Sequence, residues 1–100
     1  MEYRVSLTAR TARDLELIYE FIQAEGSDKA FTWFNDLVAK IQSLERYPER
    51  GSIVPESKKY RQLLFGKKPD VYRIVYEVAK RQRAVLIVQI RHGARAPAVD

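Results

Sequence analysis

Two alternating patterns near the carboxyl end constrain the fold of this chain more than any other feature. Residues 71–95 read VYRIVYEVAKRQRAVLIVQIRHGAR, in which apolar and polar side chains alternate twice around a short basic turn. Because successive side chains of a strand point to opposite faces, each alternating run predicts a strand with one apolar face. The two runs together predict a β-hairpin whose apolar face must be buried against other elements.

The phase of the alternation predicts which side chains of this hairpin enter the core. The set expected on the apolar face is Tyr72, Ile74, Tyr76, Val78, Leu86, Val88 and Ile90. The set expected on the open face is Arg73, Val75, Glu77, Ile87, Gln89 and Arg91. An antiparallel sheet tolerates one solvated face, so the sequence predicts a cationic surface on the side that points away from the core.

A strand and a helix are expected at the amino end. Residues 2–7 alternate and predict the strand. Thr8 offers an N-cap hydroxyl to a helix that runs to about Glu25, where Gly26 is expected to end it. The core stripe of this helix comprises Ala12, Leu15, Ile18, Tyr19 and Ile22.

Three further apolar residues of the first helix, Leu17, Phe21 and Ala24, lie on an adjoining face. One interpretation is that this second face packs against the neighbouring helix of the same chain. The other is that part of it is an exposed docking site for a partner.

A second helix is predicted from about Lys29 to Arg46, capped by Ser27 or Asp28. Its core face comprises Ala30, Phe34, Leu37, Val38, Ile41 and Leu44. Phe31 and Trp33 lie at the two opposite edges of this stripe and widen it. Only a short break separates the two helices, so they are expected to form an antiparallel hairpin.

The order of elements predicts an α+β fold: a strand, a helical hairpin and then a three-strand antiparallel meander, with the helices on one face of the sheet. Residues 51–59 read as a polar connection and residues 60–65 as the second strand. One hundred residues correspond to one domain, so residues 1–100 are expected to form a single unit with residues 95–100 as a loose tail.

Charge is distributed unevenly along the chain. Residues 1–56 carry 7 basic and 10 acidic residues, whereas residues 57–95 carry 11 basic residues against Asp70 and Glu77. Such a basic half is expected to meet an anion, which could be RNA, DNA or an acidic protein segment. There is no cysteine, no membrane-span pattern and no apolar signal-peptide core, so a cytoplasmic location is expected.

The residue types give no support for metal or nucleotide chemistry, so no metal and no cofactor are expected. His92 is the only histidine and is interpreted either as a structural hydrogen-bonding residue or as a catalytic base. RNA cleavage without a metal stays open, because the 2′-OH supplies the nucleophile and the protein supplies an acid, a base and charge stabilisation. Candidate charge stabilisers are Arg73 and Arg95, with Arg91 and Arg61 as nearby candidates.

This order of elements and four motifs resemble the RelE/ParE superfamily of type II toxin–antitoxin toxins. The motifs are YRIVY at residues 72–76, IRHGAR at 90–95, TARTARDL at 8–15 and LERYPERG at 44–51. The resemblance implies a bacterial growth-inhibiting toxin that a cognate antitoxin holds inactive. Arg73 matches the arginine of the family's YRxxY strand, and Arg95 matches the arginine after its HG turn.

The two branches of the superfamily imply different targets. RelE-like members cut mRNA in the ribosomal A site with arginines on the open sheet, lysines on the second strand and a C-terminal tyrosine. ParE-like members serve plasmid stabilization and poison DNA gyrase, which requires binding and no bond-breaking chemistry. Residues 61–65 lack the lysine pair, unless Lys67 and Lys68 substitute from the loop, and no tyrosine follows Arg95. The HGAR ending and the longer helical hairpin look more like the ParE branch, so the resemblance favours gyrase inhibition. The alternatives are a metal-independent, ribosome-dependent endoribonuclease and a non-toxic remnant that still binds antitoxin.

The resemblance also implies a toxin–antitoxin hetero-oligomer with no membrane partner. Antitoxin contact is expected at Leu17, Phe21 and Trp33. Contact with the target is expected at Arg73, Arg91, His92 and Arg95.

Overall fold

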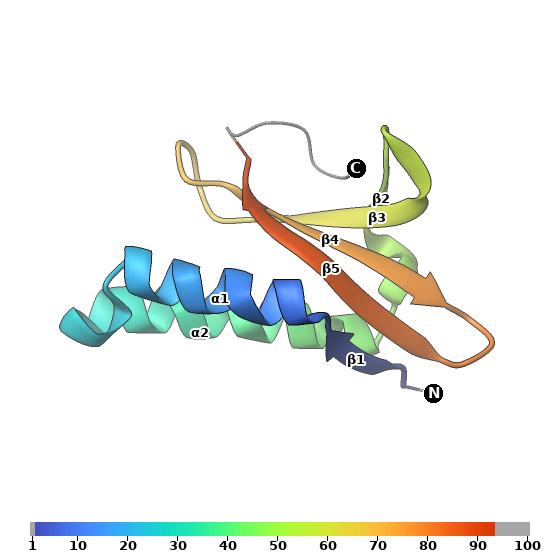
Figure 1. Cartoon of the computed structure of the whole chain (residues 1–100), viewed down its shortest axis with the longest axis horizontal. Coiled ribbons are helices and arrows are strands. Elements are labelled where there is room, and N and C mark those ends of the chain that lie inside the picture. The colour runs from blue at the N-terminus through green and yellow to red at the C-terminus, as the bar shows by residue number, and fades with distance from the viewer. Residues whose placement is uncertain (1, 94–100) are drawn as a thin grey trace.

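A five-stranded sheet with two helices on one face organises residues 2–93, the part of the chain that the computed structural model describes (Figure 1). The strands are β1 (Arg4–Leu7), β2 (Ser52–Val54), β3 (Ser57–Phe65), β4 (Tyr72–Ala79) and β5 (Ala84–His92). The helices are α1 (Ala9–Phe21) and α2 (Asp28–Gln42). The α+β order of a strand, a helical hairpin and an antiparallel meander is confirmed. The tail expected at residues 95–100 lies outside the described residues.

The sheet has the strand order β1-β5-β4-β3-β2, in which β1 runs parallel to β5 and the other pairs are antiparallel. β1 pairs with β5 only as far as Leu7 opposite Ile87, so the rest of β5 is an edge strand. The short strand β2 lies in the segment interpreted as a polar connection, and β3 begins at Ser57, three residues earlier than predicted. Three residues are too few to show an alternation, which is why the sequence did not reveal β2.

A β-bulge in β5 reverses the predicted facing of half of this strand. Val75 of β4 lies opposite Gln89, but the next residue, Tyr76, lies opposite Ile87. Val88 is therefore the extra residue of the bulge, and it shifts the alternation by one position. The predictions that Leu86 and Val88 face the core and that Ile87 faces away were wrong, and Val85 and Ile87 are the buried core residues.

The core lies between the helices and the sheet. It comprises Ile18, Leu37, Ile41, Leu44, Tyr72, Ile74, Tyr76, Val85, Ile87 and Ile90. A second, smaller cluster lies on the other face of the sheet, where Val54 of β2 packs with Val75, Tyr60 and Val88. The face that the sequence predicted to be open is therefore partly covered, because β2 brings Val54 over it.

Both helices begin at the predicted caps. The Thr8 hydroxyl accepts a hydrogen bond from the backbone N–H of Thr11 at 3.0 Å, and the Ser27 hydroxyl accepts one from Ala30 at 3.2 Å. Each cap satisfies one of the N–H groups that a helix leaves unpaired at its start. No helix within residues 2–93 is long and apolar enough to cross a membrane.

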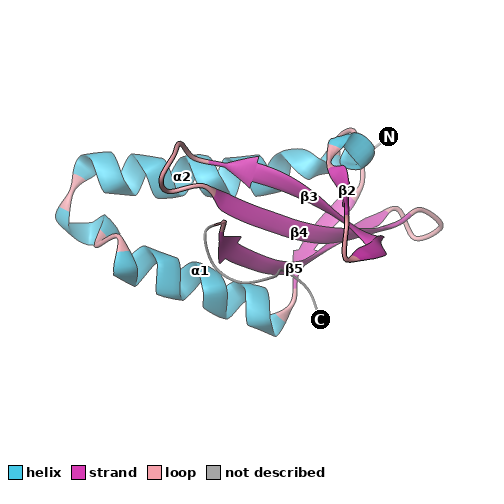
Figure 2. Cartoon of the chain, turned by 90° about the horizontal axis from the view of Figure 1, so that it is seen from above, coloured by secondary structure: helices cyan, strands magenta, loops and turns pink. Residues whose placement is uncertain are grey.

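The helices diverge from the connection between them, with strands visible in the space between (Figure 2). α1 ends at Phe21, not near Glu25, because Gln23 adopts a left-handed conformation with φ 55°. Near the connection the two helices meet through the rings of Tyr19 and Phe34, whose centroids are 5.0 Å apart. The predicted core residues Ala12 and Val38 are exposed, so the prediction that they belong to the core was wrong.

Candidate functional site

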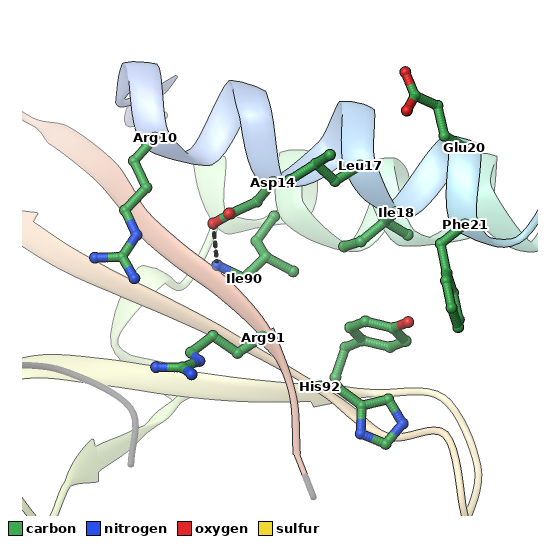
Figure 3. Close-up of a pocket in the computed structure, with 10 residues that line it drawn as sticks. Arg10, Asp14, Leu17, Ile18, Glu20, Phe21, Ile90, Arg91 and His92 are labelled. Carbon is green, nitrogen blue, oxygen red and sulfur yellow. Dashed lines mark hydrogen bonds between the residues drawn. The ribbon is translucent and has the colours of Figure 1, made fainter. Parts of the chain in front are cut away.

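A groove of about 580 Å³ lies between α1 and the end of β5 (Figure 3). Its lining includes Arg10, Asp14, Leu17 and Phe21 from α1, and Ile90, Arg91 and His92 from β5. The groove exists because β1 stops beside the first half of β5 and leaves the second half next to α1. It therefore combines apolar side chains, both signs of charge and the edge of a strand.

Leu17 and Phe21 form the apolar wall of the groove. They are one helical turn apart, and their side chains are 53% and 72% exposed. The interpretation that they pack against the neighbouring helix is wrong for both, because their side chains line the groove beside β5. Of the three residues, only Ala24 is packed within the chain, since it is buried beside the connection between the helices. Two adjacent apolar side chains exposed beside a groove are typical of an interaction site.

Two polar residues of α1 attach the helix to β5. The Thr11 hydroxyl donates a hydrogen bond to the Ile87 carbonyl at 2.7 Å, and a carboxylate oxygen of Asp14 accepts one from the Ile90 N–H at 3.1 Å. The sequence reasoning missed both residues. The signal for them is their spacing, since Thr11, Asp14 and the core residue Ile18 are separated by three and four positions and so share one helix face.

His92 is the last residue of β5 and lies at the end of the groove. Its ring contacts that of Tyr72 edge-on, with 5.2 Å between centroids. Its Nε2 lies 3.1 Å from a carboxylate oxygen of Asp70. His92 is paired with Tyr72 in the sheet, so its side chain is on the helix-facing side, away from the face that carries Arg73.

Arg73 and Arg91 lie directly opposite each other on the face of the sheet that points away from the helices. The Nε and Nη2 atoms of Arg73 donate to the Gln62 side-chain oxygen at 2.8 and 2.5 Å, and Nη2 is 3.8 Å from a carboxylate oxygen of Glu56. Like charges at directly opposite positions repel. The Glu56 carboxylate offsets part of this repulsion, and Gln62 and Glu56 together hold the guanidinium that the sequence proposed as a charge stabiliser.

Arg61 is on the opposite face from these two arginines. It pairs with the core residue Tyr76, and its guanidinium donates to the backbone carbonyls of Glu49 and Gly51 at 3.0 and 2.8 Å. The expectation that Arg61 lies near Arg73 was therefore wrong, because the odd-numbered residues of β3 face the helices. Arg95 lies outside the described residues.

Trp33, an expected antitoxin-binding residue, is half-buried beneath the groove. Its ring contacts those of Phe65 and Tyr72, with centroid distances of 5.1 and 5.5 Å. Tyr72 in turn lines the groove. Trp33 is thus connected to the groove through Tyr72 and does not itself form its wall.

The sequence also matches a known protein family. Residues 5–97 match the family described as the ParE toxin of the type II toxin–antitoxin system parDE. The chain belongs to the ParE toxin family. It is thus a type II toxin–antitoxin toxin of the RelE/ParE superfamily. Among curated proteins, no sequence matches this ParE family member.

Solved toxin structures resemble the ParE-family fold described above. A chromosomal ParDE system from P. aeruginosa contains a chain with 22% identity and a TM-score of 0.71, over 91% of this chain and 96% of that one. A chain of the RelBE2 toxin–antitoxin complex from Mycobacterium tuberculosis has 20% identity and a TM-score of 0.64, over 92% and 99% of the two chains. A mutant of the E. coli toxin RelE in the free state has 13% identity and a TM-score of 0.66, over 94% and 86%. At these identities the likeness establishes the fold.

Proposed function

We propose that this ParE-family chain inhibits bacterial growth by poisoning DNA gyrase in the cytoplasm, and that a cognate antitoxin neutralises it. The observation that carries the choice of target is the environment of Arg73. A metal-free nuclease needs an acid, a base and cations around one phosphate. The Arg73 guanidinium is held by Gln62 and Glu56, and Arg61 faces the other way. This arrangement supports a toxin that acts by binding.

The lysines of β3 also help to distinguish gyrase inhibition from nuclease activity. Lys58 and Lys59 lie at the start of β3, in residues that the sequence assigned to a connection. Arg73 pairs with Leu64, six positions from Lys58. At about 3.3 Å per residue the two side chains are rooted roughly 20 Å apart, which is too far for both to contact one phosphate. Lys58 therefore does not complete a nuclease site around Arg73.

Contact with the target is proposed at the end of β5. Arg91 and His92 lie there side by side in the sequence and on opposite faces of the strand. Arg73 lies across from Arg91, and Arg95 follows beyond the described residues. In this proposal Arg91 makes the contact on the open face, while Arg73 holds the neighbouring strand in place.

The groove between α1 and β5 is proposed as the antitoxin site. Leu17 and Phe21 offer exposed apolar surface, and Arg10 and Arg91 offer cations at its margin. Antitoxins of this class commonly present a flexible, often acidic segment that can fold as it binds, and such a segment buries apolar side chains while its carboxylates pair with arginines. The similar ParDE and RelBE proteins, solved as toxin–antitoxin systems, support such a partner.

A supercoiling assay tests the target. Purified protein is added to gyrase and relaxed plasmid, with antitoxin-saturated protein as the matched control. The proposal requires loss of supercoiling and accumulation of cleaved DNA, both prevented by antitoxin. Normal supercoiling at saturating toxin would exclude gyrase.

Two cellular readouts separate the other functions. Codon-phased mRNA cuts that disappear in Arg73→Ala would instead identify a ribosome-dependent endoribonuclease. Expression without any growth defect, combined with antitoxin binding, would identify a non-toxic remnant.

A further inference from the structure

Three segments that are distant in the sequence meet at the end of the molecule opposite the connection between the helices (Figure 1). The Tyr3 N–H donates to the Glu45 carbonyl at 2.8 Å, which joins the amino end to the segment after α2. The Arg4 N–H donates to the Arg83 carbonyl at 2.9 Å, which joins it to the turn between β4 and β5. We call the exposed side chains of Arg4, Tyr47, Arg81 and Arg83 at this end the end patch.

The end patch combines an exposed aromatic ring with cations. Tyr47 is 82% exposed, and it lines a depression together with Tyr3, two arginines and the acidic residues Glu2 and Glu49, which are paired with Arg46 and Lys80. The guanidinium carbon of Arg83 is 6.0 Å from the centre of the Tyr3 ring. Within residues 2–93, Arg4, Arg81 and Arg83 have no acidic side chain at ion-pair distance, whereas the neighbouring Lys80 is paired with Glu49 at 2.9 Å. These three arginines therefore remain available to an anion.

Two residues of the end patch have an unfavourable backbone conformation. Tyr47 and Arg83 have φ of 52° and 50°, in the left-handed region that Gly and Asn occupy most readily. At Arg83 the conformation closes the turn, in which its N–H donates to the Lys80 carbonyl at 3.2 Å. At either position Asn would adopt this left-handed conformation more readily than Tyr or Arg does. A bulky, exposed residue at such a position is an observation from which a functional contact can be inferred.

We propose that the end patch binds a nucleic acid strand, with the arginines on phosphates and the Tyr47 ring stacked on a base. Arginine presents a planar fork of donors that matches phosphate oxygens. An exposed aromatic ring stacks on any base, so it adds affinity without requiring a particular sequence. The end patch combines its exposed ring with arginines that have no ion-pair partner within residues 2–93, whereas the groove between α1 and β5 presents Leu17 and Phe21 beside the carboxylates of Asp14 and Glu20. The proposal is independent of gyrase as the target.

Fluorescence anisotropy with the full chain tests this binding. The probes are a labelled 20-nucleotide single-stranded DNA, an RNA of the same sequence and the corresponding DNA duplex. For a single strand, three phosphate contacts predict a slope of about −2 when the logarithm of the binding constant is plotted against the logarithm of the salt concentration. Tighter binding to the single-stranded DNA or to the RNA than to the duplex supports the proposal, and the tighter of these two probes identifies the source of the strand. Absence of binding to all three probes at low salt would overturn it.

Variants that relieve the unfavourable backbone conformation of Tyr47 or Arg83 separate a binding role of these residues from a structural one. Tyr47→Asn is expected to weaken single-strand binding about tenfold through loss of one stacked base, while the melting temperature stays the same or rises. Arg81→Ala with Arg83→Asn is expected to reduce the magnitude of the salt slope by about 1.4, which corresponds to two lost phosphate contacts. A fold-neutral Tyr47→Asn that binds as tightly as the parent chain contradicts the role of the ring.

Two controls distinguish binding at the end patch from non-specific attraction between opposite charges. The matched variant Lys29→Ala with Lys67→Ala removes two exposed cations at the other end of the molecule, and its affinity is expected to stay within about twofold of the parent. A loss as large as that of the arginine pair would show that the site lies elsewhere. Labelled polyglutamate of the same charge is expected to bind weakly. Equal affinity for polyglutamate would overturn the assignment in favour of an acidic protein segment.

Discussion

Asp14 on α1 accepts a hydrogen bond from the backbone N–H of Ile90 on β5, with 3.1 Å between the two atoms. β1 has already ended beside Ile87, so a carboxylate satisfies the N–H that another strand would otherwise pair with. An unpaired strand edge invites another chain to add to the sheet. Asp14 occupies the Ile90 N–H, so a partner in the groove cannot pair with this N–H, and the exposed side chains of Leu17 and Phe21 offer it apolar contact.

Removal of this carboxylate should destabilise the fold. Asp14→Ala leaves the Ile90 N–H without its charged acceptor in a partly buried site, and the free energy of unfolding is expected to fall by about 1–3 kcal/mol. Asp14→Asn keeps an amide oxygen at the same place and should cost less. Urea unfolding of the three proteins measures the difference. Equal midpoints for Asp14→Ala and the parent chain would show that the bond contributes nothing.

Substitution of the apolar wall should affect binding and leave stability intact. Leu17→Asp with Phe21→Asp changes two exposed positions, so the free energy of unfolding should change by no more than about 0.5 kcal/mol. Antitoxin affinity, measured by calorimetry, is expected to fall at least tenfold, roughly 1.4 kcal/mol, because both side chains lose apolar contact with the partner. Phe31→Asp is the control, since Phe31 is exposed on α2 outside the groove. An equal loss in the control would place the antitoxin elsewhere.

The Tyr76 hydroxyl fixes the segment that follows α2. It donates to the Pro48 carbonyl at 2.6 Å and accepts from the Gly51 N–H at 3.0 Å, in a buried site. Tyr76→Phe leaves both backbone groups without this partner, and the expected loss of stability is about 1–3 kcal/mol. Chemical unfolding near pH 7 measures it. A loss below about 0.5 kcal/mol would mean that water replaces the hydroxyl.

The same residue predicts how stability changes at alkaline pH. Burial raises the pKa of Tyr76 above its ordinary value, because the charged phenolate is poorly solvated inside the protein. As pH rises above about 10, the unfolded chain loses this proton before the folded chain does, so the stability falls. Tyr76→Phe should have a shallower decline above about pH 10 than the parent chain. Identical slopes for the two proteins would exclude Tyr76 as a cause of the decline.

Gln89 should be replaceable by an apolar residue with a gain in stability. Its side chain is 2% exposed, and its Nε2 has no hydrogen-bond partner within the described part of the chain. Gln89→Met has a similar shape without the unsatisfied donor, so the free energy of unfolding is expected to rise by about 1 kcal/mol. Thermal unfolding checks this, with Gln62→Met as a contrasting variant that should be destabilised through loss of the bonds to Arg73. A destabilised Gln89→Met would show that Nε2 is satisfied in solution.

Local signals in the sequence predicted most of the elements. Thr8 and Ser27 cap the two helices as expected, because an N-cap acts within the first turn and needs no distant partner. The alternation of residues 72–76 correctly placed Tyr72, Ile74 and Tyr76 in the core. The same rule failed for Leu86, since a single bulged residue reverses the facing of all residues on one side of it.

The sequence by itself determined the α+β order, the two caps, the basic second half and the motifs that led to the toxin family. Only the tertiary structure decided which residues share a surface. Strand pairing put Arg73 opposite Arg91 and turned Arg61 to the other face, and the packing of α1 beside β5 placed Leu17 and Phe21 at an exposed groove. The physical reason is the separation of the interacting residues along the sequence. Helix caps and strand alternation depend on neighbours within a few residues, whereas strand register, bulges and helix divergence depend on contacts between segments far apart in the chain.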